Sequence, residues 1–269
     1  MRIAHEAPLS IMDEIQTMTD YDYCLVHLLE QYPTYLEFFK KAKISGRQII
    51  MDCSLFELGV AFDSKKYYKW LLEIQPDEYI VPDVWQDCDL NISSFESFTN
   101  NFDLSQLSGK KIGVLQGTTL QELVKCYHFM NENADKIAIS FGYDYFLEST
   151  QEYSVNSNAY RFNVGRIKLI NHLAGMGIIN KNKPHHLLGC GVPTEFSHYV
   201  AMGYNFIDSI DTSHPVMAGI SRKSYDDTET LLDKSPQKMV ELFDTEISSS
   251  NLELIKYNIT KFKGICTPK

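Results

Sequence analysis

The sequence predicts an α/β protein built as a (β/α)8 TIM-type barrel, and two observations favour this fold. Strand-like and helix-like segments alternate about seven times over the 269 residues, and the apolar runs are continuous, as in parallel strands buried on both faces. Polar residues stand at the carboxyl end of at least five of these apolar runs. In a barrel the carboxyl ends of all strands surround one mouth, so these residues could share one site. A doubly wound sheet is the alternative, but the glycine-rich phosphate loops common in that fold do not occur in the sequence.

The strands are expected where short apolar runs lie between turn residues. They are the segments 24–29, 49–52, 79–81, 112–115, 136–141, 186–191 and 206–210, and the eighth strand is left unassigned. The first run is so short that a helix remains its alternative. Residues 1–20 are expected to form an entry loop, and the polar segments 89–108 and 145–160 irregular connections. We expect residues 1–269 to form a single barrel domain.

Helices are expected between the strands, and two of them carry a local start signal. Asp63 has the residue type and position of an N-cap before a helix that reaches residue 74. Thr118 with Gln121, or Thr119 with Glu122, would form a capping box for the helix that follows residue 119. Further helices are expected over 35–43, 161–176 and 193–202, with two C-terminal helices within about 235–263.

The composition limits the function classes. Acidic residues outnumber basic ones by 35 to 25, and the net charge of −10 argues against a protein that coats nucleic acid non-specifically. The six cysteines form no CxxC pair, so we expect reduced thiols rather than a zinc ribbon or a disulfide scaffold. No apolar run has the length of a bilayer and the N-terminus has no secretory h-region, so we expect a cytoplasmic protein without a membrane partner.

The polar groups at the strand ends form the candidate site. An aspartate that ends a buried strand is costly unless it is hydrogen-bonded or takes part in chemistry, and we expect these groups to converge on one pocket. Carboxylates together with an amide fit glycosyl transfer, in which one carboxylate attacks an anomeric carbon and another moves protons. No His/Cys cluster has ligand spacing, so we expect neither a metal nor a cofactor. The strand-end groups are Asp52, Asp83, Gln116, Ser140, Gly189 and Asp208.

Asp211 is the rival of Asp208 as a nucleophile, because it follows three residues later on the same segment. We prefer Asp208 because it closes the predicted strand directly. For any single strand-end aspartate, capping of the next helix is the alternative to a chemical role.

Four segments carry motifs in a fixed order between about residues 48 and 213. They read IMDCSLFE at 50–57, IGVLQG at 112–117, HLLGCGVPTE at 186–195 and GYNFIDS at 203–209. In the same order they resemble the TDSGG-aromatic-Q, FGIQQG, YLMGVGxPED and GxDxFDS motifs of the tRNA-guanine transglycosylase superfamily. That superfamily is a (β/α)8 group that exchanges guanine in a nucleic acid for a 7-deazaguanine.

The sequence also departs from the superfamily pattern. The two glycines of the first motif are missing, the GGLAxGE stretch reads ISFGYD at 139–144, and the C-terminal zinc module has no counterpart. The missing module and the short chain resemble the compact phage-type branch, which inserts 7-deazaguanines such as preQ0 into DNA. The resemblance therefore implies a pentosyltransferase that modifies DNA, located in the host cytoplasm if it is phage-encoded.

The resemblance also implies a role for each site residue. Asp208 would attack C1′ and displace guanine, and Asp52 would act as general acid and base, the two facing each other across a flat slot. Seven further residues would bind the base, with Asp83 and Gln116 at its edge, Phe56 and Leu188 on its two faces, and Ser140, Phe141 and Gly189 around it.

Three other functions stay open on the sequence alone. The same base exchange could act on tRNA, and a homologue without catalysis could bind nucleic acid as an accessory subunit. A barrel glycoside hydrolase is the third, although such enzymes usually employ a glutamate as the acid and none of the strand-end acids chosen here is a glutamate.

Overall fold

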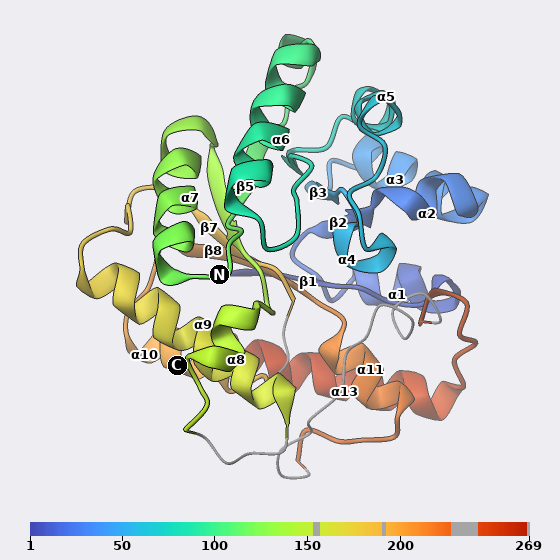
Figure 1. Ribbon diagram of the computed structural model, residues 1–269. Coiled ribbons are helices and arrows are strands. Elements are labelled where there is room, and N and C mark those ends of the chain that lie inside the picture. Colours follow the sequence, from blue (N-terminus) through green and yellow to red (C-terminus); the bar gives the residue numbers. More distant parts are fainter. Residues whose placement is uncertain (153–156, 190–191, 227–241, 268–269) are drawn as a thin grey trace. The chain divides into compact units, whose positions relative to one another are not determined.

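The computed structural model describes residues 1–152, 157–189, 192–226 and 242–267, and it confirms the predicted fold class. Within these ranges eight parallel strands alternate with helices, which is the arrangement of a (β/α)8 barrel (Figure 1). The strands are β1 (Arg2–His5), β2 (Asp22–Leu25), β3 (Ile49–Asp52), β4 (Glu78–Ile80), β5 (Lys110–Val114), β6 (Lys136–Ile139), β7 (His185–Leu187) and β8 (Ile207–Thr212).

The helices follow the strands in chain order. They are α1 (Met12–Gln16), α2 (Val26–Gln31), α3 (Pro33–Ile44), α4 (Leu55–Leu58), α5 (Ser64–Ile74), α6 (Cys88–Asn101), α7 (Leu120–Asn133), α8 (Asp144–Glu148), α9 (Asn158–Gly175), α10 (Glu195–Ala201), α11 (His214–Ile220) and α13 (Ser249–Cys266). Two short 3-10 turns, η1 (Leu9–Ile11) and η2 (Leu104–Gln106), precede α1 and β5. Among the described helices, none combines the length and apolar character that a membrane crossing requires.

The chain forms two compact units. The central unit comprises residues 21–139 and holds strands β2 to β6, paired in chain order with every strand parallel to its neighbour. The terminal unit comprises residues 1–20 and 140–269 and holds β1, β8 and β7, with β8 in the middle.

In the central unit the local signals act as the sequence predicts. β3 has the predicted bounds, and its first three residues are almost fully buried. Asp63 caps α5 by accepting a hydrogen bond from the Lys66 amide at 2.9 Å. Of the two possible capping boxes, the structure forms the one between Thr119 and Glu122 at the start of α7. Both caps satisfy amide groups that a helix leaves without partners in its first turn.

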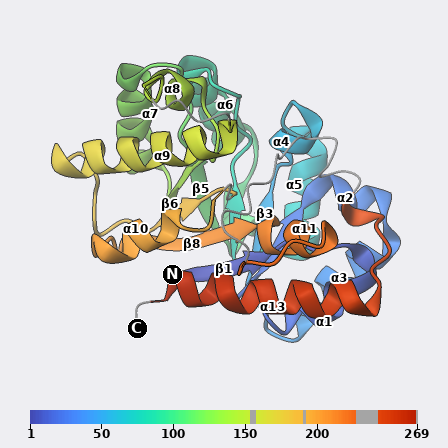
Figure 2. The same cartoon turned by 90° about the horizontal axis from the view of Figure 1, so that it is seen from below.

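In the terminal unit α13 covers one face of the three-stranded sheet. The ring of His5, the last residue of β1, packs edge-on against Phe262 of α13, with 5.8 Å between the ring centroids. Phe262 also contacts Phe196 of α10 at 5.5 Å, so the two helices and β1 share one apolar layer. Figure 2 shows α13 running alongside β1.

Several sequence-based element assignments were wrong. The unassigned strand is β1, inside the expected entry loop, and the run at 24–29 divides between β2 and α2. Segment 89–108 contains α6, in which Phe95 and Phe98 are buried although the residues next to them in sequence are polar. Segment 145–160 begins within α8. β8 continues to Thr212, two residues beyond its predicted end. The second tail helix is α13, whereas the expected start of the first lies outside the described residues.

Gly165 of α9 lies where α8 approaches most closely. A methyl group at this position would come within 2.3 Å of Phe146 Cβ and 2.6 Å of Phe146 Cα. At Gly175, in the last turn of the same helix, no described atom outside the adjoining residues and the helix backbone lies within 4 Å of the corresponding position. The two glycines therefore differ in packing while they share one helix.

We expect Gly165→Ala to lower the free energy of unfolding by roughly 1–3 kcal/mol, because α8 must move to make room. Gly175→Ala is the matched control, and we expect it to be neutral or to stabilise by up to about 1 kcal/mol through helix propensity. Urea unfolding followed by circular dichroism measures both. Equal effects of the two substitutions would contradict the close packing of α8 on α9.

His5 is buried without a well-formed hydrogen bond. Its side chain is 7% exposed, and neither ring nitrogen meets hydrogen-bond geometry with a described residue. Burial lowers the pKa of His5 to about 3, with a smaller contribution from Lys263, while Asp20 and the Thr212 backbone act in the opposite direction. The folded protein therefore holds this ring neutral under conditions in which the unfolded chain protonates it.

Between pH 6.5 and about 3 the unfolded state binds a proton at His5 that the folded state does not, so stability falls as the pH falls. We expect His5→Leu to flatten this dependence by up to about 1.4 kcal/mol per pH unit. His172→Leu, at an exposed position on α9, is the control. Chemical unfolding at a series of pH values measures the slope, and an unchanged slope in His5→Leu would refute the assignment.

Candidate functional site

In the central unit, polar side chains from neighbouring strand ends meet, whereas the predicted convergence of all six strand-end groups on one pocket stays a prediction. Asp83 follows β4 and Gln116 follows β5, and Gln116 Nε2 donates a hydrogen bond to Asp83 Oδ2 at 2.6 Å. Cys53, next to the candidate Asp52 at the end of β3, donates from Sγ to Asp83 Oδ1 at 3.2 Å. Three adjacent strand ends thus contribute to one buried polar cluster.

Asp83 is the group with unusual electrostatics in this cluster. It is 5% exposed, and burial raises its pKa to about 6, although the hydrogen bonds from Gln116 and Cys53 favour the ionised form. Burial also raises the pKa of the Cys53 thiol well above its usual range, so the thiol keeps the proton that it donates. Gln116 Oε1 accepts from the Gln86 amide at 2.8 Å, which fixes the orientation of the Gln116 side chain.

Asp52 is held by two donors at the end of β3. The Ser54 amide donates to Oδ1 at 2.5 Å, and the Tyr23 hydroxyl of β2 donates to Oδ2. Ser54 has a φ of 60°, so the turn after Asp52 takes the left-handed conformation that a carboxylate–amide bond helps to maintain. Asp52 therefore fixes a turn and presents a carboxylate at the predicted position. The contact of Tyr23 with Asp52 was not predicted, because Tyr23 belongs to none of the sequence motifs.

In the terminal unit, Asp211 rather than Asp208 lies at the carboxyl end of β8. Asp211 is 5% exposed, and its Oδ1 contacts His186 Nε2 at 3.0 Å. The other nitrogen of His186, Nδ1, contacts Ser209 Oγ at 2.9 Å. Both Asp211 oxygens lie 3.2 Å from the Gly189 amide, which donates to them. Residues 186, 209 and 211 share one face of the sheet, as the pairing of His186 with Ser209 requires.

Asp208 does not close β8, contrary to the prediction, because the strand starts one residue before Asp208 and ends at Thr212. Asp208, Ile210 and Thr212 point to one face of β8, and Thr212 pairs with His5, whose ring packs against α13. Its Oδ2 forms an ion pair with Arg2 Nη2 at 2.6 Å. Asp208 therefore lies at the amino end of β8, on the opposite face from Asp211. Asp52 belongs to the central unit and Asp208 to the terminal unit. The expectation that the two residues face each other stays a prediction.

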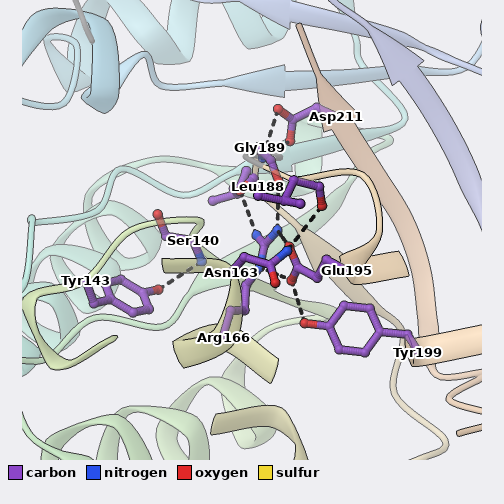
Figure 3. A network of polar contacts seen from close by, with 10 residues as sticks. Ser140, Tyr143, Asn163, Arg166, Leu188, Gly189, Glu195, Tyr199 and Asp211 are labelled. Atoms are coloured by element: carbon purple, nitrogen blue, oxygen red, sulfur yellow. Dashed lines mark hydrogen bonds and ion pairs between the residues drawn. The ribbon is translucent and has the colours of Figure 1, made fainter. Parts of the chain in front are cut away.

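A buried ion pair holds the connection that follows β7 (Figure 3). Arg166 of α9 donates from Nε and Nη2 to the two oxygens of Glu195 at 2.6 and 2.9 Å, and both side chains are fully buried. The same guanidinium donates to the carbonyls of Leu188 and Gly189, each at 2.9 Å. The Tyr199 hydroxyl completes the set by donating to Glu195 Oε1 at 2.5 Å.

The clamp formed by Arg166 and Glu195 explains the position of Gly189. Its carbonyl is drawn to Arg166 while its amide points to Asp211, and its φ of 67° is in the region that favours glycine. Leu188 and Gly189 are both partly exposed, as a binding role requires. Gly189 was predicted from sequence, but the ion pair of Arg166 with Glu195 was missed, because 29 residues separate the two in the chain.

Ser140 and Phe141 lie after β6, at the start of the second part of the terminal unit. The Ser140 amide donates to the Tyr143 hydroxyl at 3.0 Å, as Figure 3 shows. The Phe141 ring lies over the Arg166 guanidinium with 5.5 Å between them, so it packs on the clamp. Both residues are therefore linked to ordered neighbours, and their predicted role in base binding stays a prediction.

Comparisons with known proteins add no family assignment. No protein-family model matches the chain, and no curated protein matches it. Within the described ranges, no group of three or more His, Cys, Asp or Glu side chains could hold a metal ion. The functional argument therefore depends on the geometry of the two polar clusters.

The pKa of Asp83 has a consequence for stability. Because its pKa of about 6 exceeds the ordinary value of 3.8, the folded protein gains stability from this group at low pH and loses it as the pH rises through 6. We expect Asp83→Asn to raise the free energy of unfolding at pH 8 by an amount on the order of 1–3 kcal/mol, and to change it little at pH 4.

Urea unfolding at the two pH values measures the effect of Asp83→Asn. Asp89→Asn is the matched control, because Asp89 lies in the first turn of α6, shortly after Asp83 in the chain, and its side chain is 77% exposed. If Asp83→Asn destabilised the protein equally at both pH values, the Asp83 carboxylate would not be the buried charge described above.

Proposed function

We propose that this protein is a guanine transglycosylase that exchanges guanine in DNA for a 7-deazaguanine base such as preQ0, through a covalent aspartate–C1′ intermediate. The observation that carries the proposal is the buried pair of Asp83 and Gln116 at adjacent strand ends. The four ordered motifs in the sequence supply the reaction type, and the pair supplies a chemical reason for the choice of a guanine-like base.

The pair has hydrogen-bonding capacity that suits a guanine edge. One amide hydrogen of Gln116 is donated to Asp83, and the second can bind the O6 acceptor of the base. Each carboxylate oxygen of Asp83 accepts one side-chain hydrogen bond and has a lone pair left for the ring N–H and the amino group of guanine. A base without this donor and acceptor pattern would leave buried polar groups unpaired, so the pair would discriminate strongly.

The proposed reaction has two balanced halves. A carboxylate attacks C1′ of the target nucleoside, the bond from C1′ to the guanine nitrogen breaks, and Asp52 gives the leaving base a proton. The incoming base then loses a proton to Asp52, its nitrogen attacks C1′, and the carboxylate–C1′ bond breaks. In a duplex the target nucleotide must first leave the base stack.

The nucleophile that we propose is Asp211. It lies at the carboxyl end of a parallel strand, where barrel enzymes place their reacting groups. The His186 ring and the Gly189 amide orient its carboxylate and leave lone pairs for an attack. Asp208, the first choice from sequence, is paired with Arg2 at the other end of the strand, and that charge pair favours a structural role.

Exchange of radiolabelled guanine into DNA and into tRNA, with the same preparation, tests the proposal. We expect label to enter DNA and a protein–DNA adduct to appear on denaturing gels. Asp211→Asn should reduce exchange by roughly a thousand-fold or more, because it removes the attacking oxygen. Asp208→Asn, three residues away on the opposite face, should stay within about ten-fold of the unmodified protein.

Each other outcome has a defined meaning. Exchange that survives in Asp211→Asn and disappears in Asp208→Asn would return the nucleophile to Asp208. Label in tRNA alone would replace DNA as the substrate. If the protein binds nucleic acid but labelled guanine enters neither DNA nor tRNA, the proposed enzymatic activity is rejected, and a non-catalytic nucleic-acid-binding homologue is the remaining hypothesis.

A further inference from the structure

Trp85 is a large aromatic side chain presented to solvent beside the base-edge pair. It lies two residues beyond Asp83 in the loop after β4 and is 38% exposed. Within the described part of the chain, its indole makes neither a hydrogen bond nor a ring contact. The other tryptophan, Trp70, differs because its Nε1 donates to Glu30 Oε1 at 3.4 Å.

The loop that carries Trp85 is fixed on both sides. The Val84 amide donates to Asn91 Oδ1 at 3.1 Å, and Asn91 in turn donates to the Val114 carbonyl of β5 at 2.9 Å. The Gln86 amide donates to Gln116 Oε1 at 2.8 Å, and Gln86 has a φ of 54°. A left-handed residue other than glycine persists only where its surroundings impose it. Single exposed apolar residues are common on protein surfaces. Trp85 differs because its loop is held by hydrogen bonds, one of which is accepted by Gln116.

We propose that Trp85 is a stacking site for a nucleobase that neighbours the exchanged guanine in the nucleic-acid strand. This inference rests on the proposed function, since it assigns the adjacent base to the same substrate. Every base has an aromatic face, so an indole can stack on it whatever the sequence. Gln116 couples the two contacts, because it donates to Asp83 through its amide nitrogen and accepts from the Trp85 loop through its oxygen.

The charge of the protein favours a stacking contact over a purely electrostatic one. The net charge is −10, and binding through phosphates depends on Lys and Arg side chains that release counterions. Stacking on an exposed indole adds affinity without a positive charge. An acidic protein that acts on a polyanion therefore needs contacts of this kind.

Fluorescence provides a direct test, because the chain contains two tryptophans. In the full-length Trp70→Phe variant all indole emission comes from Trp85. We expect a short oligothymidylate to quench this emission, and an abasic sugar–phosphate oligomer of the same length and charge to leave it unchanged. An oligouridylate of that length tests whether RNA supplies the base as well as DNA does.

Affinity measurements with substitutions complete the experiment. We expect Trp85→Ala to weaken oligothymidylate binding roughly ten-fold, and Trp85→Phe to retain most of the affinity because it keeps an aromatic face. Ile44→Ala is the control: Ile44 is 88% exposed at the end of α3, on the side where β3 begins. It should bind as the unmodified protein does.

The outcomes separate this inference from the proposed function. Equal quenching by the base-containing and abasic oligomers, or equal affinity of the alanine and phenylalanine variants, overturns the stacking site. Guanine exchange without quenching of Trp85 also overturns it and leaves the transglycosylase standing. Quenching by oligothymidylate in a protein that exchanges no guanine rejects the transglycosylase and also overturns the assignment of the stacked base as the neighbour of an exchanged guanine.

Discussion

The alternation of side chains along β8 determines which groups of the terminal unit can act together. Because successive residues of a strand point to opposite faces, a spacing of three places Asp208 and Asp211 on different sides of the sheet. The His5 side of the sheet packs against α13, and Asp208 forms an ion pair with Arg2 at the strand start. The other face gathers Asp211, Ser209 and His186 near the strand end. The strand therefore carries two aspartates with different physical situations, and our choice of Asp211 as the proposed nucleophile depends on that difference.

The buried charges in the two units are stabilised in different ways. Arg166 and Glu195 lose all contact with water, and their mutual attraction is supplemented by hydrogen bonds to carbonyls and to Tyr199. Without such bonds the desolvation of a buried ion pair commonly exceeds the Coulomb attraction. Asp83 is buried with an amide and a thiol as partners, and burial raises its pKa although both hydrogen bonds favour the ionised form. The first arrangement fixes a connection, whereas the second is the base-edge contact of the proposed function.

Local signals predicted a large part of the fold, and long-range contacts account for the rest. The bounds of β3 and the capping box of α7 follow from neighbouring residues, so the sequence predicts them. β1 was missed because Arg2 and His5 interrupt its apolar run, and its strand character depends on pairing with β8, more than two hundred residues later. The end of β8 was misplaced because Asp211 looks like a loop residue until His186 and Gly189 supply its partners.

The two ends of the sheet in the central unit treat their buried carboxylates differently, and this difference does not depend on any family resemblance. At the amino ends of the strands, Glu78 of β4 and Lys136 of β6 form an ion pair at 2.6 Å, and the lysine is almost fully buried. A carboxylate at that end is therefore compensated by a cation. At the carboxyl ends Asp83 is buried beside neutral donors, and its ionised form destabilises the fold above pH 6. A group that lowers stability under neutral conditions is expected where a ligand repays the desolvation, because perturbed carboxylates gather at functional sites. The contrast between Glu78 and Asp83 is thus a second reason, beside the motifs, for proposing a site at the carboxyl ends.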